Sequence, residues 1–342
     1  MGLLDFLTNE IAIDLGTANT LIIQKDKVVV DEPSIIAIDR ISGDVLAVGR
    51  QAMQMHEKTH ENIKTIRPLK DGVIADFNAA EQMIRGMIKM IEGTKKKIFT
   101  PSHRMVICIP SGITEVEKRA VRDSAEHAHA KEVYMVYEPI AAAIGLGIDI
   151  EQPIGSMVVD IGGGTTEIAV IALSGIVCDQ SIRVAGDAFN KDILDYMRRQ
   201  HNLLIGERTA EKVKMMVGAA TTDLDNPPEE YEIRGRDLMT GIPKVVKLSH
   251  AEVAFALDKS ITKIEEAVLK ALEISPPELS ADIYDNGIHL TGGGALLRGL
   301  DKRLALKTKL KIHVAEDPLR AVVRGTGQAL KNIQGYKTVL MS

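Results

Sequence analysis

Asp14-Leu15-Gly16-Thr17 directly follows the apolar run Ile11-Ala12-Ile13 near the start of this chain of 342 residues. A similar stretch, Asp160-Ile161-Gly162-Gly163-Gly164-Thr165, follows Met157-Val158-Val159 in the second half of the sequence. Each stretch leads into another run rich in β-branched residues, so each predicts a strand, a glycine turn and a second strand. We therefore expect two similar domains that face one nucleotide.

The composition of the two turns suits phosphate binding. Glycine allows the backbone to approach a ligand closely, and successive N–H groups of such a turn form a concavity that binds anions. Asp14 and Asp160 would repel a phosphate, but they are suited to Mg²⁺, usually through water. A single Asp-x-Gly-Thr is more often an ordinary tight turn, whereas its repetition in the same setting favours phosphate binding.

Length and composition narrow the class of protein. A chain of 342 residues, 45% hydrophobic and 26% charged, is typical of a globular protein with two domains. Its net charge of −5 argues against a nucleic-acid-binding surface. Cys108 and Cys178 lie in apolar runs far apart in the sequence. This placement predicts buried free thiols in a reducing compartment. We expect no transmembrane helix and no secretory signal.

Hydrophobic periodicity predicts alternating strands and helices in both halves. In the first half we expect strands within residues 11–48, 104–109 and 133–137, and helices over residues 78–92, 114–130 and 140–147. In the second half we expect strands within residues 156–184 and 288–290, and helices over residues 188–200, 208–217 and 249–275. Thr114 with Glu117, and Ser249 with Glu252, form capping-box patterns. This mixture places the fold in the α/β class.

Three further segments have both a functional and an ordinary interpretation. Thr291-Gly292-Gly293-Gly294-Ala295 permits close backbone approach or anion capture at a helix N-terminus, but glycine turns are common at such junctions. Residues 207–214 contain a Glu–Lys pair that could hold ribose hydroxyls and flank adenine, or simply form a solvated helix face. Glu138 ends a strand and could orient an attacking water, or it is a carboxylate favoured by a helix dipole.

Two segments could contact a membrane. The first is the apolar N-terminus, with Leu3, Leu4, Phe6 and Leu7. The second places Ile98 and Phe99 beside Lys95-Lys96-Lys97, and basic charge next to inserted apolar side chains is attracted by anionic lipid. The alternatives are a frayed terminus and an ordinary solvated loop.

Together these motifs resemble the actin-like ATPase superfamily, and within it the bacterial cell-shape actins. Residues 13–20 and 159–167 resemble the first and second phosphate motifs, and residues 290–297 resemble the adenosine motif. Residues 67–77, 137–139 and 204–207 also match. The resemblance spans nearly the whole chain, with the motifs in the family's order.

The resemblance implies an actin-like, duplicated ribonuclease-H-like α/β fold with two lobes around a nucleotide cleft. Each lobe would have a large and a small subdomain. The large subdomain of lobe I would comprise residues 1–32, 73–143 and 319–342, and the small one residues 33–72. The large subdomain of lobe II would comprise residues 144–180 and 249–318, and the small one residues 181–248.

The resemblance also implies a site for ATP and Mg²⁺. By position, Asp14 and Asp160 would serve the metal through water, while Glu138 and Thr165 would position the attacking water. The phosphates would be held by Thr17, Ala18, Asn19, Gly162, Gly163, Gly164 and Thr165. The nucleoside would be held by Glu211, Lys212, Val213, Lys214, Gly292, Gly293, Gly294 and Ala295.

The function implied is that of a weak ATPase that forms double protofilaments on the inner face of the cytoplasmic membrane. Such filaments organise peptidoglycan synthesis with the membrane-bound elongation machinery, and so determine rod shape. Three alternatives remain open at this point: a small-molecule kinase, a chaperone-type ATPase and a plasmid-segregating actin. A kinase needs a base aimed at a substrate hydroxyl, and Glu138 is the sole candidate that we find. A chaperone needs an appended peptide-binding domain, which we do not expect here.

Overall fold

The computed structural model describes residues 8–92 and 102–342, which form two compact units. Unit 1 contains the described residues up to Pro153, together with Ala172–Ile176 and Arg320–Ser342. Unit 2 contains Ile154–Ile171 and Val177–Leu319. Unit 2 is therefore inserted into the sequence of unit 1. The finer division into four subdomains stays a prediction.

Unit 1 is built on a five-stranded sheet in the order β10-β9-β1-β2-β3. The strands are β1 (Thr8–Leu15), β2 (Asn19–Gln24), β3 (Lys27–Pro33), β9 (Ser102–Ile109) and β10 (Ala130–Tyr137). β1 is parallel to β9 and antiparallel to β2, and β9 is parallel to β10. Lys25 and Asp26 join β2 to β3 with φ angles of 49° and 64°, as a tight hairpin turn requires. The predicted strands are confirmed.

The larger helices of unit 1 are α2 (Phe77–Glu92), α3 (Glu115–His127), α4 (Glu138–Gly145) and α10 (Ala321–Lys331). The predicted capping box of Thr114 and Glu117 begins α3. The prediction that α3 reaches Ala130 is wrong, because Ala130 already belongs to β10 and His129 has a φ of 69°. The predicted range 140–147 for α4 is also shifted: the helix begins at Glu138, since proline is tolerated in a first helical turn.

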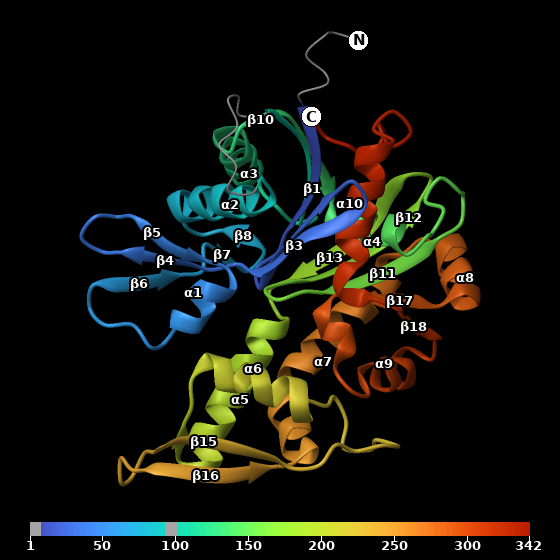
Figure 1. Cartoon of the computed structure of the whole chain (residues 1–342). Coiled ribbons are helices and arrows are strands. Elements are labelled where there is room, and N and C mark those ends of the chain that lie inside the picture. The colour runs from blue at the N-terminus through green and yellow to red at the C-terminus, as the bar shows by residue number, and fades with distance from the viewer. Residues whose placement is uncertain (1–7, 93–101) are drawn as a thin grey trace. The chain divides into compact units, whose positions relative to one another are not determined.

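Helices α4 and α10 pack unusually closely in unit 1 (Figure 1). A Cβ added at Gly325 would lie 1.7 Å from the carbonyl oxygen of Ala141. A Cβ added at Gly145 would lie 1.9 Å from the carbonyl oxygen of Ala321. Because real atoms cannot approach so closely, glycine at both positions is what allows the two helices to touch along their backbones.

A smaller part of unit 1 lies between β3 and α2 in the sequence. It contains a sheet in the order β5-β4-β6 and a short hairpin of β7 with β8. The elements are β4 (Ile36–Asp39), β5 (Val45–Val48), α1 (Arg50–Met55), β6 (Ile63–Ile66), β7 (Leu69–Lys70) and β8 (Val73–Ile74). Ile35, Ala37, Ala47 and Ala52 form its own small hydrophobic cluster.

The main sheet of unit 2 repeats that of unit 1, with the order β13-β12-β11-β17-β18. Its strands are β11 (Ser156–Ile161), β12 (Thr166–Ala172), β13 (Gly175–Ile182), β17 (Ile288–Thr291) and β18 (Ile312–Val314). β11 is antiparallel to β12 and parallel to β17, which is parallel to β18. Two sheets of the same order and sense confirm the internal duplication and the α/β class.

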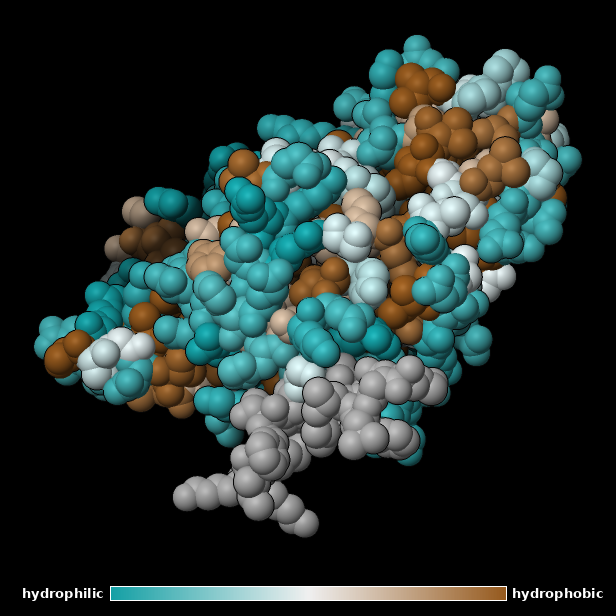
Figure 2. All heavy atoms as spheres, turned by 90° about the horizontal axis from the view of Figure 1, so that it is seen from above, coloured by the Kyte–Doolittle hydropathy of each residue, from teal (hydrophilic) through white to brown (hydrophobic). Residues whose placement is uncertain are grey.

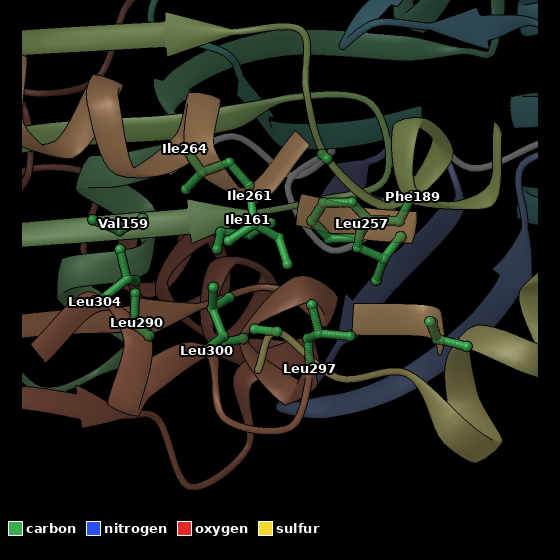
Figure 3. Close-up of a cluster of buried hydrophobic side chains, with 14 of the residues drawn as sticks. Val159, Ile161, Phe189, Leu257, Ile261, Ile264, Leu290, Leu297, Leu300 and Leu304 are labelled. Atoms are coloured by element: carbon green, nitrogen blue, oxygen red, sulfur yellow. The ribbon is translucent and has the colours of Figure 1, made fainter. Parts of the chain in front are cut away.

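Helices cover this sheet and enclose the core of unit 2. They are α5 (Gly186–His201), α6 (Glu207–Val217), α7 (His250–Ile274), α8 (Pro277–Asn286), α9 (Leu300–Thr308) and the short 3₁₀ helices η2 (Gly293–Leu296) and η3 (Pro318–Arg320). A further sheet contains β14 (Leu203–Leu204), β15 (Tyr231–Asp237) and β16 (Pro243–Leu248). Figure 3 shows Phe189, Leu257 and Ile261 of the helices in the same buried cluster as Ile161 of β11. The predicted helices 188–200, 208–217 and 249–275 are confirmed within two residues.

The surface combines charged and apolar side chains. Figure 2 shows apolar side chains on one face as separate groups between hydrophilic ones. Among the most exposed large apolar residues are Ile41, Val116, Met239 and Phe255, each more than 70% exposed. In the part of the chain that the structure describes, no helix is long and apolar enough to cross a membrane.

Candidate functional site

The functional residues predicted in unit 1 meet at one edge of its main sheet. Strands β1, β9 and β10 are parallel, so their carboxyl ends lie at the same edge. Asp14 lies near the end of β1 and is in register with Cys108 of β9. Glu138 directly follows the last residue of β10. Open α/β sheets bind ligands at this edge.

The first glycine turn, between β1 and β2, is held in one conformation by its neighbours. A Cβ at Gly16 would lie 2.6 Å from the carbonyl oxygen of Asn19, so the turn requires glycine. Ser34 donates from Oγ to the carbonyl of Gly16 (2.6 Å) and from its N–H to the carbonyl of Ala18 (2.9 Å). The N–H of Gly72 donates to Oγ1 of Thr17 (3.0 Å). Such fixed turns bind a ligand without losing much conformational entropy.

Asp14 is an electrostatically perturbed residue of this edge. Burial disfavours its charged form and raises its pKa from the usual 3.8 to about 6. The Cys108 thiol donates a hydrogen bond to Oδ1 of Asp14 (Sγ–Oδ1 3.2 Å) and counteracts part of that rise. Burial, and then the nearby carboxylates of Asp14 and Glu138, hold the pKa of Cys108 well above its usual range. The thiol therefore stays protonated and keeps donating.

The second glycine turn, between β11 and β12, is held by hydrogen bonds from the first turn of helix α5. The N–H of Gly162 donates to the carbonyl of Thr165 and closes the turn (2.9 Å). The N–H groups of Gly186 and Asp187 donate to the carbonyls of Gly162 (3.2 Å) and Gly163 (2.7 Å). Because the first turn of α5 occupies these carbonyls, the turn is fixed in shape. Thr165 and Asp160 are both buried beside it, whereas Gly162 and Gly163 are half-buried.

The third glycine cluster packs directly on the strand that carries Asp160. Gly292 has a φ of 80°, and a Cβ there would lie 2.4 Å from Oδ1 of Asp160. A Cβ at Gly294 would lie 2.2 Å from Cγ2 of Ile161. Gly292 precedes the four-residue 3₁₀ helix η2, and Gly293 and Gly294 are its first two residues. A helix of four residues is too short to build a helix dipole. Of the two functional interpretations, the structure therefore favours close backbone approach.

Helix α6 separates its four predicted nucleoside residues. Glu211 and Lys214 lie on one face, and Nζ of Lys214 donates to Oε2 of Glu211 (2.8 Å). Val213 is fully buried in the core of unit 2, and Lys212 is exposed to solvent. Only Glu211 and Lys214 therefore have side chains joined in a polar network.

Several residues of this environment were not predicted from the sequence. They are Ser34 and Cys108 in unit 1, and Gly186 and Asn190 in unit 2. Asn190 had a visible signal, because it is a polar residue next to Phe189 and three positions before Ile193 on the buried face of α5. The others act through contacts between segments distant in the sequence, which no local pattern indicates.

The remaining predicted residues differ in exposure, and some of them lie outside the described residues. Ala18 is half-buried and Asn19 exposed in the first turn, while Gly293 is exposed and Ala295 buried in the third cluster. Leu3, Leu4, Phe6, Leu7, Ile98 and Phe99 lie outside the described residues, so their membrane role stays a prediction. Within residues 8–92 and 102–342, no group of three or more His, Cys, Asp or Glu side chains is arranged to hold a metal ion.

Comparison with known proteins decides the family. The sequence model described as MreB/Mbl protein matches residues 8–338, which is nearly the whole chain. The chain belongs to the MreB/Mbl family. The predicted resemblance to the bacterial cell-shape actins is thereby confirmed.

Relatives within the MreB/Mbl family are similar over nearly their whole length. The chain is 50% identical to the cell shape-determining protein Mbl of Bacillus subtilis, over 95% of this chain and 96% of that protein. It is 49% identical to the cell shape-determining protein MreB of Escherichia coli K12, over 98% and 97% respectively.

Solved structures confirm the actin-like fold of this MreB/Mbl family member. MreB5 of Spiroplasma citri, solved bound to AMPPNP, has a TM-score of 0.90 and 38% identity, covering 97% of this chain and 98% of that one. A MamK double helical filament has a TM-score of 0.77 at 22% identity, over 94% and 99%, and supports the fold alone.

Proposed function

We propose that this chain is an ATP-dependent, filament-forming protein that determines rod cell shape from the inner face of the cytoplasmic membrane. In this proposal its filaments organise peptidoglycan synthesis together with the membrane-bound elongation machinery. The observation that carries the proposal is the near-complete match to proteins named cell shape-determining, at about 50% identity. The two repeated glycine turns support the nucleotide-binding part of the proposal.

Nucleotide binding is supported by the turns and by the MreB5 structures, which were solved with AMPPNP and with ADP. In the proposal, backbone N–H groups of residues 17–19 and 163–165 bind the phosphates, while the N–H of Gly162 closes the second turn on Thr165. Glu211 and Lys214 face the ribose and adenine, and the backbone of residues 292–295 lies against the nucleoside.

Mg²⁺ is proposed to accompany the nucleotide, held by Asp14 and Asp160 through water. The raised pKa of Asp14 fits this role, since a carboxylate that is costly to ionise gains from a nearby cation. Asp160 is a buried carboxylate beside the second turn, and Mg²⁺ is ordinarily held by one or two carboxylates together with phosphate oxygens. Bound there, the ion would neutralise phosphate charge.

Hydrolysis is proposed to depend on Glu138 and Thr165, which would position a water for in-line attack. Glu138 lies at the same sheet edge as Asp14 and is close enough to Cys108 to raise the pKa of that thiol. A second carboxylate therefore lies at the sheet edge that carries the proposed metal residue of unit 1. With water positioning as the main catalytic contribution, we expect slow turnover, as suits a switch that times filament disassembly.

Self-association is supported by an exposed apolar group on the β15–β16 hairpin of unit 2. Leu238, Met239, Ile242 and Val245 are 39%, 81%, 63% and 54% exposed within eight consecutive positions. Exposed apolar groups of this kind mark protein–protein contacts. Membrane binding is proposed for the N-terminal apolar residues and for Ile98 and Phe99 beside three lysines.

The decisive experiment is to sediment the purified chain with anionic liposomes and Mg²⁺-ATP, and to image the pellet by electron microscopy. We expect paired filaments on the lipid. A variant that lacks residues 1–9 and carries Ile98→Ser and Phe99→Ser should leave the lipid while still forming filaments. A monomer that hydrolyses ATP but never assembles would contradict the proposal and favour the small-molecule kinase. Persistent lipid binding by the variant would exclude both proposed anchors.

A further inference from the structure

Asn190 of helix α5 is bonded to Glu211 of helix α6, a residue proposed to face the nucleoside. Asn190 is 8% exposed, and its Nδ2 donates to Oε2 of Glu211 on helix α6 (2.7 Å). Helices α5 and α6 contact each other in unit 2 (Figure 1), so this bond joins the two helices. Oε2 of Glu211 also accepts from Nζ of Lys214 (2.8 Å). One carboxylate oxygen is therefore held by two donors.

The orientation of the Asn190 amide follows from the chemistry of its partner. An ionised carboxylate only accepts hydrogen bonds, so the amide must present its NH₂ group to Glu211. Oδ1 of Asn190 is thereby turned away, and it is buried without a hydrogen-bond partner in the part of the chain that the structure describes. An unsatisfied buried acceptor costs stability. An apolar side chain of similar size would avoid that cost, so packing alone does not explain an asparagine here.

The second carboxylate oxygen of Glu211, Oε1, is available to a ligand. The side chain of Glu211 is 46% exposed, and among the described residues Oε1 accepts no hydrogen bond. A carboxylate fixed at one oxygen and open at the other is preorganised to accept bonds from sugar hydroxyls. Lys214 extends the network, because Nζ also donates to the carbonyl of Gly186 (3.2 Å), whose N–H donates to Gly162 of the second turn (3.2 Å).

We propose that Asn190 is a positioning residue that sets sugar selectivity by fixing Glu211 in the orientation that accepts hydrogen bonds from the ribose hydroxyls. The inference rests on the proposed nucleotide-binding function. It assigns the discrimination between ribonucleotides and deoxyribonucleotides to a residue that does not touch the ligand. Without Asn190, Lys214 alone holds Glu211, and the carboxylate is free to rotate about its terminal bond.

The test compares the affinities of the full chain for ATP, 2′-deoxy-ATP and 3′-deoxy-ATP, by calorimetry at concentrations where sedimentation detects no assembly. The variants are Asn190→Leu, which removes the donor and the unsatisfied acceptor together, and Asn190→Asp, which sets two carboxylates against each other. Lys191→Ala, at an exposed position next in the same helix, is the matched control. Urea unfolding of each variant reports its stability.

We expect the wild-type chain to prefer ATP over at least one deoxy analogue. In both Asn190 variants this preference should fall about tenfold, because each variant loses one charge-assisted hydrogen bond to Glu211. Asn190→Leu should unfold at the wild-type urea concentration or above, and Lys191→Ala should keep the preference. An unchanged preference in either Asn190 variant, or no preference in the wild-type chain, would overturn the inference while leaving ATP binding intact. A wild-type chain that binds no ATP would instead contradict the proposed function itself.

Discussion

The thiol of Cys108 donates a hydrogen bond to the carboxylate of Asp14, with Sγ and Oδ1 3.2 Å apart and the two residues 94 positions apart in the sequence. Two opposing effects meet in this pair. Burial raises the pKa of Asp14 to about 6, and the thiol lowers it by stabilising the charged form. Cys108 therefore helps to keep the proposed metal residue ionised near neutral pH.

Removing that donor should raise the pKa of Asp14 further. In Cys108→Ala we expect the carboxylate to titrate above 6, because burial persists and the stabilising bond is gone. Carbon NMR of Asp side chains across pH 4–9 measures this directly. Cys178→Ala is the control, since that thiol contacts Ser275 in unit 2 and not Asp14. An unchanged titration in Cys108→Ala would mean that the bond does not form in solution.

Asp14→Asn should stabilise the nucleotide-free chain at neutral pH. The folded pKa of about 6 lies above the usual 3.8, so folding favours the protonated form, and the cost of ionisation is present above about pH 6. The variant should gain about 1–3 kcal/mol of unfolding free energy at pH 7.5. The gain should shrink as the pH falls from 6 and vanish below 3.8.

Asp39→Asn should show the opposite sign. The backbone N–H groups of Ser42 and Ile41 lower the pKa of Asp39, so its contribution to stability is present at neutral pH and is lost as the pH falls through the lowered pKa. Urea unfolding of both variants between pH 3 and 8 distinguishes the two cases. A pH-independent difference for Asp14→Asn would show that this carboxylate is not perturbed.

Asp160→Asn should reduce Mg²⁺-dependent ATP hydrolysis at least about 100-fold. The amide keeps the shape of the side chain beside Gly292, so the fold should survive the change. A neutral oxygen is a much weaker partner for a hydrated cation than a carboxylate. Phosphate release at increasing Mg²⁺ is the measurement, and wild-type turnover in the variant would exclude the assigned metal role.

Glu138→Gln should slow hydrolysis by about 10²–10⁴-fold while leaving ATP affinity nearly unchanged. The amide can still hydrogen-bond to a water but polarises it poorly. Single-turnover hydrolysis and calorimetric ATP binding separate the two effects. If binding falls in proportion to hydrolysis, Glu138 contacts the nucleotide and does not position water.

Gly325→Ala should destabilise unit 1 by about 2 kcal/mol or more, because the added methyl group would overlap the carbonyl of Ala141. Gly327→Ala, two residues along the same helix, is the matched control. Its Cβ would meet Ile23 at 3.4 Å, an ordinary contact, so we expect a gain of about 0.5–1 kcal/mol from helix propensity. Equal effects of the two substitutions on urea unfolding would refute the close approach of α4 and α10.

Local patterns predicted the local structure well. The capping boxes at Thr114 and Ser249 begin α3 and α7, and the repeated Asp-x-Gly turns end β1 and β11. These features depend on residues within a few positions of each other. The error at the end of α3 is also local: Ala130 suits a helix by propensity, but pairing with β9 places it in a strand.

Contacts between segments distant in the sequence were not predicted. Two examples are the hydrogen bonds between Asn190 and Glu211 and between Gly72 and Thr17. They form because of how the elements pack, and the hydrophobic periodicity around one partner does not predict the other. The sequence therefore predicted where the two glycine turns lie but not what holds them in place. The same limit applies to Val213, whose burial follows from the rotation of α6 about its axis.

The return of α10 to unit 1 has a consequence for how the protein is made. Residues 321–331 pack on α4 and β1, and the backbone of Met341 pairs with that of Met135 at the edge of β10. Because synthesis runs from the N-terminus, unit 1 emerges first and still lacks this helix until all of unit 2 has been translated. Unit 2 is a continuous stretch apart from five residues, and it can fold during that interval. Unit 1, which is translated first, is therefore completed last. Until α10 has been translated, the apolar face of unit 1 that this helix covers stays exposed in the nascent chain.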